Sequence, residues 1–176
     1  MAIENFGYAL TLKGFDFADA KGEVMDALNL EGFVELSEID VKETLKESLG
    51  IEFRNYLIVG VWHPELAYEA LGAEPNAGLL IPYNVVLQDR IEAEGIVVSL
   101  QSPALLMAKV GNHELESISR KTDGLIQKVV LALGGNITGK HPTKLEDVIP
   151  MHPKAYPARH MKEKLDGRRE EGYELP

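Results

Sequence analysis

Four residues of the sequence combine side chains that small-molecule sites use: Trp62, His63, Tyr83 and Asn84. An imidazole titrates near neutral pH, an indole and a phenol each offer an aromatic face with a polar end, and an amide can orient a polar ligand. If the strands that carry these residues are neighbours and their faces match, the side chains converge. The sequence therefore predicts a ligand-binding site at these four residues.

A structural interpretation of the same residues stays open beside the functional one. An aromatic cluster in a subunit interface has the same composition as an apolar pocket, with His63 hydrogen-bonded to backbone. Asn84 follows Pro82 in an apolar stretch, and its amide could pair with backbone groups that the proline leaves free. Pro64, at the first position of a predicted helix, accounts for the turn at His63 without any chemistry.

The sequence gives little support for a catalytic role. A histidine that acts as a general base needs a group that orients it, and only the adjacent Glu65 is identifiable for His63. The chain contains no cysteine, which excludes thiolate catalysis, disulfides and cysteine-ligated metals. We therefore assign no catalytic residue and expect a non-catalytic protein without a cofactor or a metal.

Two patterns near the C-terminus imitate functional motifs. The stretch "GGNITGKH", residues 134–141, has the spacing of a phosphate-binding loop. However, it lacks a hydroxyl residue after the lysine, and it follows a predicted helix where such a loop follows a strand. The histidines His141, His152 and His160 place no two imidazoles on one helical turn. Neither pattern predicts a site.

The elements that would position the four residues follow from the hydrophobic periodicity. Period-2 or continuous apolar patterns predict strands at residues 8–13, 33–41, 53–62, 79–89 and 95–102. Helical spacing predicts helices at residues 15–32, 41–50, 64–78 and 112–133. Neighbouring strands in such an order pair mostly antiparallel, with the long helices on one face. The prediction is an α+β fold with an antiparallel sheet of about five strands, order β-α-β-β-β-β-α with short extra helices.

Charge and composition limit the partners. Residues 1–133 hold 10 Lys+Arg against 21 Asp+Glu, a balance of −11, and residues 134–176 hold 8 against 7, a balance of +1, which gives the net charge of −10. A domain with this negative charge repels nucleic-acid phosphates and anionic lipids. We therefore expect neither nucleic acid nor a membrane as a partner. With no secretory signal and no apolar run long enough to span a bilayer, we expect a cytoplasmic protein.

The last 43 residues differ from the rest, since they hold five of the nine prolines and three of the five histidines. We expect residues 1–133 to form one α+β domain and residues 134–176 an extended C-terminal arm. Leu145, Val148 and Ile149 give this arm enough apolar surface to dock on the domain or on a neighbouring subunit.

Three stretches in order suggest a family: "SEIDVKETLKESLGIEF", "HPELAYEAL" and "GLLIPYNVVL". With these stretches, residues 6–133 resemble the domain-of-unknown-function family numbered 302. The resemblance implies a sheet with helices on one side, similar to the half-domain of the TATA-binding protein, and a homodimer. It implies no activity. Many relatives carry cysteine at the places of Trp62 and Tyr83 and asparagine at the place of His63, so any thiol chemistry of those relatives cannot operate here.

The sequence favours a homodimeric scaffold or interaction protein as the function. Tyr56, Ile58, Trp62 and Tyr83 would present an uncovered apolar patch unless the sheet face opposite the helices is covered by a second copy. The alternative function is a small-molecule-binding protein or an enzyme with its pocket around Trp62, His63, Tyr83 and Asn84.

Overall fold

The computed structural model describes residues 6–90, 94–108 and 110–135 of the chain. The strands are β1 (Gly7–Leu12), β2 (Val34–Asp40), β3 (Tyr56–Trp62), β4 (Tyr83–Arg90) and β5 (Gly95–Gln101). The helices are α1 (Phe17–Leu30), α2 (Val41–Leu49), α3 (Pro64–Ala73), α4 (Pro103–Met107) and α5 (His113–Ala132), with a 3-10 helix η1 at Pro75–Leu79.

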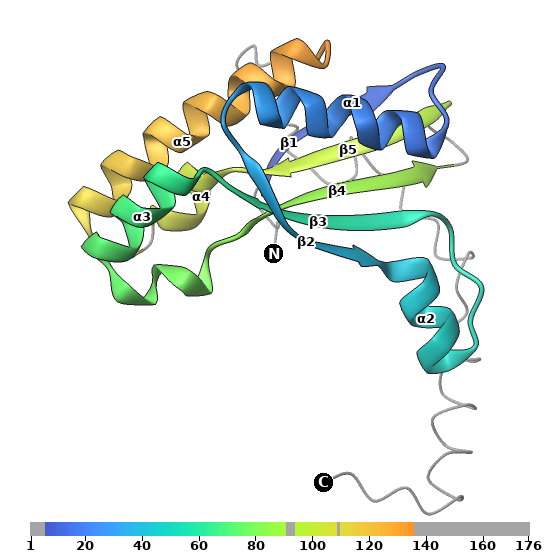
Figure 1. Cartoon of the computed structure of the whole chain (residues 1–176), viewed down its shortest axis with the longest axis horizontal. Coiled ribbons are helices and arrows are strands. Elements are labelled where there is room, and N and C mark those ends of the chain that lie inside the picture. The colour runs from blue at the N-terminus through green and yellow to red at the C-terminus, as the bar shows by residue number, and fades with distance from the viewer. Residues whose placement is uncertain (1–5, 91–93, 109, 136–176) are drawn as a thin grey trace, which may run out of the picture.

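The five strands form one antiparallel sheet in the order β1-β5-β4-β3-β2. Strands that follow one another in the chain are paired from β2 through β5: β2 with β3, β3 with β4, and β4 with β5. Strand β1 pairs with β5 and forms the other edge of the sheet. Helices α1 and α5 lie over the same face of this sheet (Figure 1). We call that side the helix face and the opposite side the open face.

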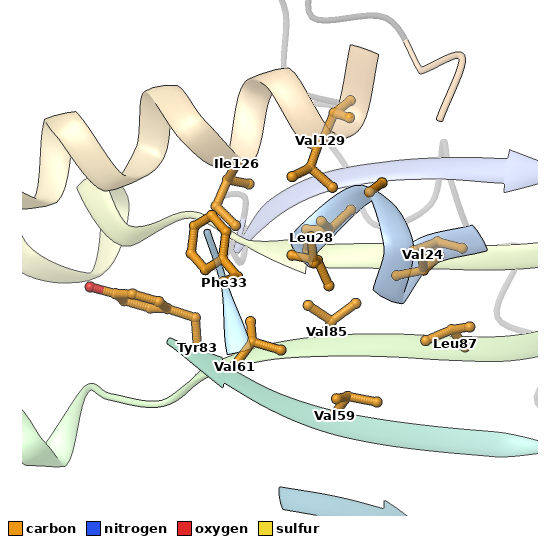
Figure 2. Close-up of a cluster of buried hydrophobic side chains, with 14 of the residues drawn as sticks. Val24, Leu28, Phe33, Val59, Val61, Tyr83, Val85, Leu87, Ile126 and Val129 are labelled. Carbon is orange, nitrogen blue, oxygen red and sulfur yellow. The ribbon is translucent and has the colours of Figure 1, made fainter. Parts of the chain in front are cut away.

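The hydrophobic core lies between the helix face and the two long helices. Because side chains alternate along a strand, every second residue of β3, β4 and β5 points into this layer. Figure 2 shows the central part of the core, where side chains of α1 and α5 meet those of β3 and β4. Its almost fully buried members include Val24, Leu28, Val59, Val61, Val85, Leu87, Ile126 and Val129.

In strand β2 the acidic side chains face the helices and the apolar side chains face away from them, the reverse of the pattern in β3. Glu35 and Glu38 pair with helix-face residues of β3, and Lys21 of α1 donates to the Glu38 carboxylate. Val34 and Ile39 pair with open-face residues of β3 and are 40% and 47% exposed. The apolar side of β2 therefore faces away from the helices.

An irregularity in pairing divides β2. The register between β2 and β3 shifts between Glu35 and Ser37, so Leu36 has no partner of its own in the ladder. Such a bulge bends and twists the strand that carries it. Leu36 is exposed at this point of the sheet's edge.

The two long helices have well-defined ends. The Asp16 side chain accepts a hydrogen bond from the backbone N–H of Asp19 at 2.8 Å at the start of α1, and Asn112 caps α5 in the same way. After α1, Gly32 adopts φ of +82°, a left-handed conformation that turns the chain into β2.

The structure confirms the predicted α+β class and the antiparallel five-stranded sheet, with differences at particular elements. The sequence places Pro82 inside a strand, whereas β4 begins at Tyr83, after a cis Ile81–Pro82 peptide. The physical reason is that β4 is a central strand, where every N–H is needed for pairing and proline has none. The short helix α4 was not predicted, because five residues are too few to show a helical period.

Two further expectations concern the C-terminal arm and the absence of a membrane-spanning helix. Residues 136–176 of the predicted C-terminal arm lie outside the described residues. Within the described ranges, no helix combines the length and apolarity needed to cross a bilayer.

Candidate functional site

The register of β3 and β4 separates the predicted site residues onto two faces. Tyr83 pairs with Val61, and Asn84 pairs with Gly60. Since alternation places Val61 on the helix face, Tyr83 lies there too, while Asn84 and Trp62 lie on the open face. The strands are neighbours as the predicted site requires, but the phenol does not share the face of the indole. The ligand-binding role of the four residues stays a prediction.

Tyr83 is part of the hydrophobic core. Its side chain is 3% exposed and lies near Phe33 and Val61 (Figure 2). Burial raises the pKa of Tyr83 to about 12; the nearby Asp123 carboxylate acts in the same direction, and a hydrogen bond with Thr122 opposes it. The phenol therefore stays protonated to a higher pH than an exposed tyrosine does.

His63 occupies the turn between β3 and α3. It immediately precedes Pro64, the first residue of α3, as the sequence predicts. The imidazole stands edge-on to the Phe33 ring, with 5.9 Å between ring centroids and planes at 90°. Its Nε2 faces Gly32: a Cβ added to Gly32 would lie 2.8 Å from this nitrogen. His63 thus packs the end of β3 against the turn that leaves α1.

Two polar atoms in this region have different surroundings. The Nδ1 atom of His63 is buried and has no hydrogen-bond partner within the described part of the chain. At Asn84 the backbone N–H donates to Oε1 of Gln101 at 2.8 Å, and the Asn84 residue itself is exposed. The Gln101 side chain thus satisfies the backbone N–H of Asn84, and the pairing of the Asn84 amide near Pro82 stays a prediction.

Rows of paired residues cross the open face from β2 toward β1. They are Ile39–Ile58–Val86–Ser99–Ala9, Tyr56–Gln88–Val97–Thr11 and Ser37–Gly60–Asn84, with the pair Val34–Trp62 beside the last. The row from Ile39 to Val86 is entirely aliphatic. None of the described strand residues on this face carries a carboxylate, although the chain holds 28 acidic residues.

A buried polar cluster, which the sequence did not predict, lies at one end of the helix face. The Asp123 carboxylate of α5 accepts hydrogen bonds from three side chains: Tyr8 Oη at 2.7 Å, Gln127 Nε2 at 3.0 Å, and Ser102 Oγ. Gln127 Nε2 also donates to Tyr8 Oη at 2.8 Å. Ser102 in addition caps α4 by accepting from the backbone N–H of Leu105. The cluster joins β1, the start of α4 and α5.

The cluster changes the protonation behaviour of Tyr8. Burial is the largest cause that raises the pKa of Tyr8 to about 12, and the hydrogen bond to Asp123 adds to it, while bonds with Gln127 and Ser102 act in the opposite direction. The signal that could have revealed the cluster is Asp123 itself, the one charged residue on the buried stripe of α5 from Leu115 to Val129. A buried carboxylate requires donors.

The described part of the chain contains no group of three histidine or acidic side chains arranged to hold a metal ion. The histidines His141, His152 and His160 lie outside the described residues.

The chain belongs to the family described as domain of unknown function DUF302, whose model matches residues 8–133. The match covers the whole sheet apart from Gly7 and extends through α5. It confirms the resemblance seen in the sequence. A search of curated proteins found no match.

A solved structure supports the same fold. The chain is similar to an uncharacterized conserved DUF302 protein from Bacillus stearothermophilus, known from a crystal structure, with a TM-score of 0.64 and 20% sequence identity. The similarity covers 73% of this chain and 96% of the other.

We predict that Gly32→Ala destabilises the protein more than Gly14→Ala. Both glycines have positive φ, so each substitution costs about 1–2 kcal/mol for the left-handed backbone. Only at Gly32 does the new methyl group meet a side chain, His63. Urea denaturation should show an additional loss of about 1 kcal/mol at Gly32, and a His63→Ala background should remove it. Equal losses at the two glycines would contradict the packing role of His63.

The buried tyrosines predict a loss of stability at high pH. Since the folded-state pKa of Tyr83 is raised, the unfolded chain releases this proton first, and the free energy of unfolding falls as pH rises from about 10 to 12. For Tyr83 the slope is about 1 kcal/mol per pH unit. Urea titrations at several pH values should show a shallower slope for Tyr83→Phe. The control Tyr68→Phe, at an 83% exposed position, should keep the wild-type slope.

Proposed function

We propose that the protein is a homodimer whose subunits pack open face against open face, and that it serves as a non-catalytic interaction protein. The observation that carries this proposal is the reversed pattern of β2. A strand at the edge of a sheet with one solvated face normally turns its apolar side toward the core. Here Val34 and Ile39 extend the apolar surface of the side without helices.

Charge supports a second copy of the same chain as the partner. With a net charge of −10, two copies repel each other over most of their surface. The open face lacks carboxylates among its described strand residues, so it is the side on which two acidic subunits can approach. A basic partner would instead be favoured by an acidic face.

The arrangement of residues suits a two-fold interface. In such an interface the same patch is used on both subunits, so the aliphatic row Ile39–Ile58–Val86 would contact its own counterpart. Trp62 and Tyr56 flank this row on the same strand, and both are half-buried in the single chain. Completing their burial would stabilise the dimer, since aromatic residues contribute strongly to interface energies.

We predict that Ile39→Lys converts a dimer into a monomer. Multi-angle light scattering at micromolar concentration should give twice the 19.4 kDa mass of the chain for the wild type. It should give the mass of one chain for the variant. A lysine at this position would bring unpaired charges into the apolar centre of the interface. Because Ile39 is 47% exposed, the monomer should keep its fold and its circular dichroism spectrum.

The matched control for this experiment is Leu79→Lys, which changes an 87% exposed leucine of η1, outside the strands of the sheet. It should leave the dimer intact. A wild-type protein that is monomeric at these concentrations would refute the proposed assembly.

A second candidate function is small-molecule binding beside Trp62, His63 and Asn84. It is favoured by the shared face of Trp62 and Asn84 and by the buried Nδ1 of His63, which has no partner in the described part of the chain. Tyr83 would contribute by packing behind the strand. A bound polar group would satisfy the imidazole nitrogen.

Thermal shift with a library of metabolites and divalent metals tests this second candidate. A ligand of the site should raise the melting temperature of the wild type and of His113→Ala, whose imidazole is 99% exposed on α5, but not that of His63→Ala. Stabilisation that persists in His63→Ala, or none across the library, would reject the site.

A further inference from the structure

Arg54 is held in a fixed position at one end of the open face. It lies two residues before Tyr56, the first residue of β3, and its Nη2 donates to Oε1 of Gln88 at 2.8 Å. The guanidinium carbon lies 4.8 Å from the centre of the Phe53 ring and 5.5 Å from that of Tyr56. A cation over aromatic faces is attracted by their negative charge density, so the two rings orient the guanidinium.

The hydrogen-bonding capacity of Arg54 exceeds what the surrounding protein uses. A guanidinium has five N–H donors. Within the described residues, Gln88 accepts from one nitrogen, the buried Nε has no acceptor, and no carboxylate lies at ion-pair distance. A buried donor without an acceptor costs free energy, and more so when it is charged. Arg54 as a whole is half-exposed.

The neighbours of Arg54 define the kind of anion that fits. Lys42 lies near, but it donates to Asn55 Oδ1, and Asn55 in turn donates to Asp89, a helix-face residue that pairs with Ile96. Among the described side chains no second cation faces Arg54, whose guanidinium offers a planar fork of donors. Such a fork forms a bidentate pair with a carboxylate.

The surface beside the guanidinium is apolar. Along β3 the open face continues from Tyr56 to Ile58, and Val86 of β4 pairs with Ile58. A ligand whose carboxylate bonds Arg54 would therefore place its remaining atoms against an aromatic ring and aliphatic side chains. This combination favours a carboxylate carried on a small apolar or aromatic group.

We propose that Arg54, with Phe53, Tyr56 and Gln88, forms a binding site for small apolar monocarboxylates at the end of the open face. The site goes beyond the proposed dimer. Arg54 and Phe53 lie outside the aliphatic row, whereas the remaining atoms of the ligand would contact Tyr56, Ile58 and Val86, which the proposed interface also uses. The site also differs from the candidate site at Trp62, which is at the other end of β3.

Benzoate is the probe for this site, and benzamide is its neutral isostere. In calorimetric titrations of the full chain, benzoate should bind saturably, and benzamide should bind at least about tenfold more weakly. Arg54→Gln should reduce benzoate affinity by a similar factor. Arg54→Lys, which keeps the charge and loses the planar fork, should also weaken it, by about fivefold. Inorganic phosphate should bind more weakly than benzoate.

Arg120→Gln is the matched control, since Arg120 is an exposed arginine of α5 already paired with Glu116 at 3.2 Å. It should leave benzoate affinity unchanged. Melting temperatures of all variants verify that they are folded. Absence of saturable benzoate binding, equal binding of benzamide, or unchanged affinity in both Arg54 variants would overturn the proposal.

The carboxylate could also come from a side chain of a second copy. Titration of Ile39→Lys separates the two sources: benzoate binding to the wild type with an affinity equal to, or up to about tenfold below, that of this variant supports a free ligand that shares part of its surface with the second copy. Binding that appears only in Ile39→Lys would mean that a subunit carboxylate occupies Arg54, and would overturn the site for free monocarboxylates. A monomeric wild type would refute the dimer and leave the benzoate test unaffected.

Discussion

Alternation of side chains along paired strands determines most of this structure, because helices cover only one face of the sheet. Once β3 places Val59 and Val61 beneath α1 and α5, the register with β2 directs Glu35 and Glu38 to the same side and Ile39 to the other. Glu38 can then bond with Lys21 of α1, and the apolar residues of β2 extend the face opposite the two long helices. The proposals for the open face depend on this assignment of side chains to the two faces of the sheet.

The helix face is held together by a second kind of constraint. Asp123 needs several donors because its carboxylate is nearly excluded from water. Tyr8 and Ser102 supply them from segments 115 and 21 residues away in the chain. Hydrogen bonds have narrower geometry than apolar contacts, so this cluster allows only one placement of α5 on the sheet. A sliding of the helix by one turn would separate the carboxylate from Tyr8 and Ser102 and leave only Gln127, on the same helix, as a donor.

The sequence was sufficient for the elements and insufficient for their relative faces. Local periodicity predicts both strands that carry Trp62 and Tyr83, and Pro64 correctly marks the start of α3. Whether Trp62 and Tyr83 share a face depends on the pairing between two strands, and a shift by one residue reverses the answer. The partners of Asp123 and the stacking of Arg54 are likewise contacts between segments, which no local pattern encodes. Pro82 was misplaced because its apolar neighbours resemble a strand.

The bulge at Leu36 has a consequence for how copies of this chain can associate. A regular, exposed edge strand offers a continuous ladder of N–H and C=O groups on which another strand can add, and repetition of that contact produces open-ended filaments. The extra residue at Leu36 interrupts the ladder of β2, and the negative charges of Glu35 and Glu38 flank the interruption. Growth by strand addition at this edge is thereby discouraged.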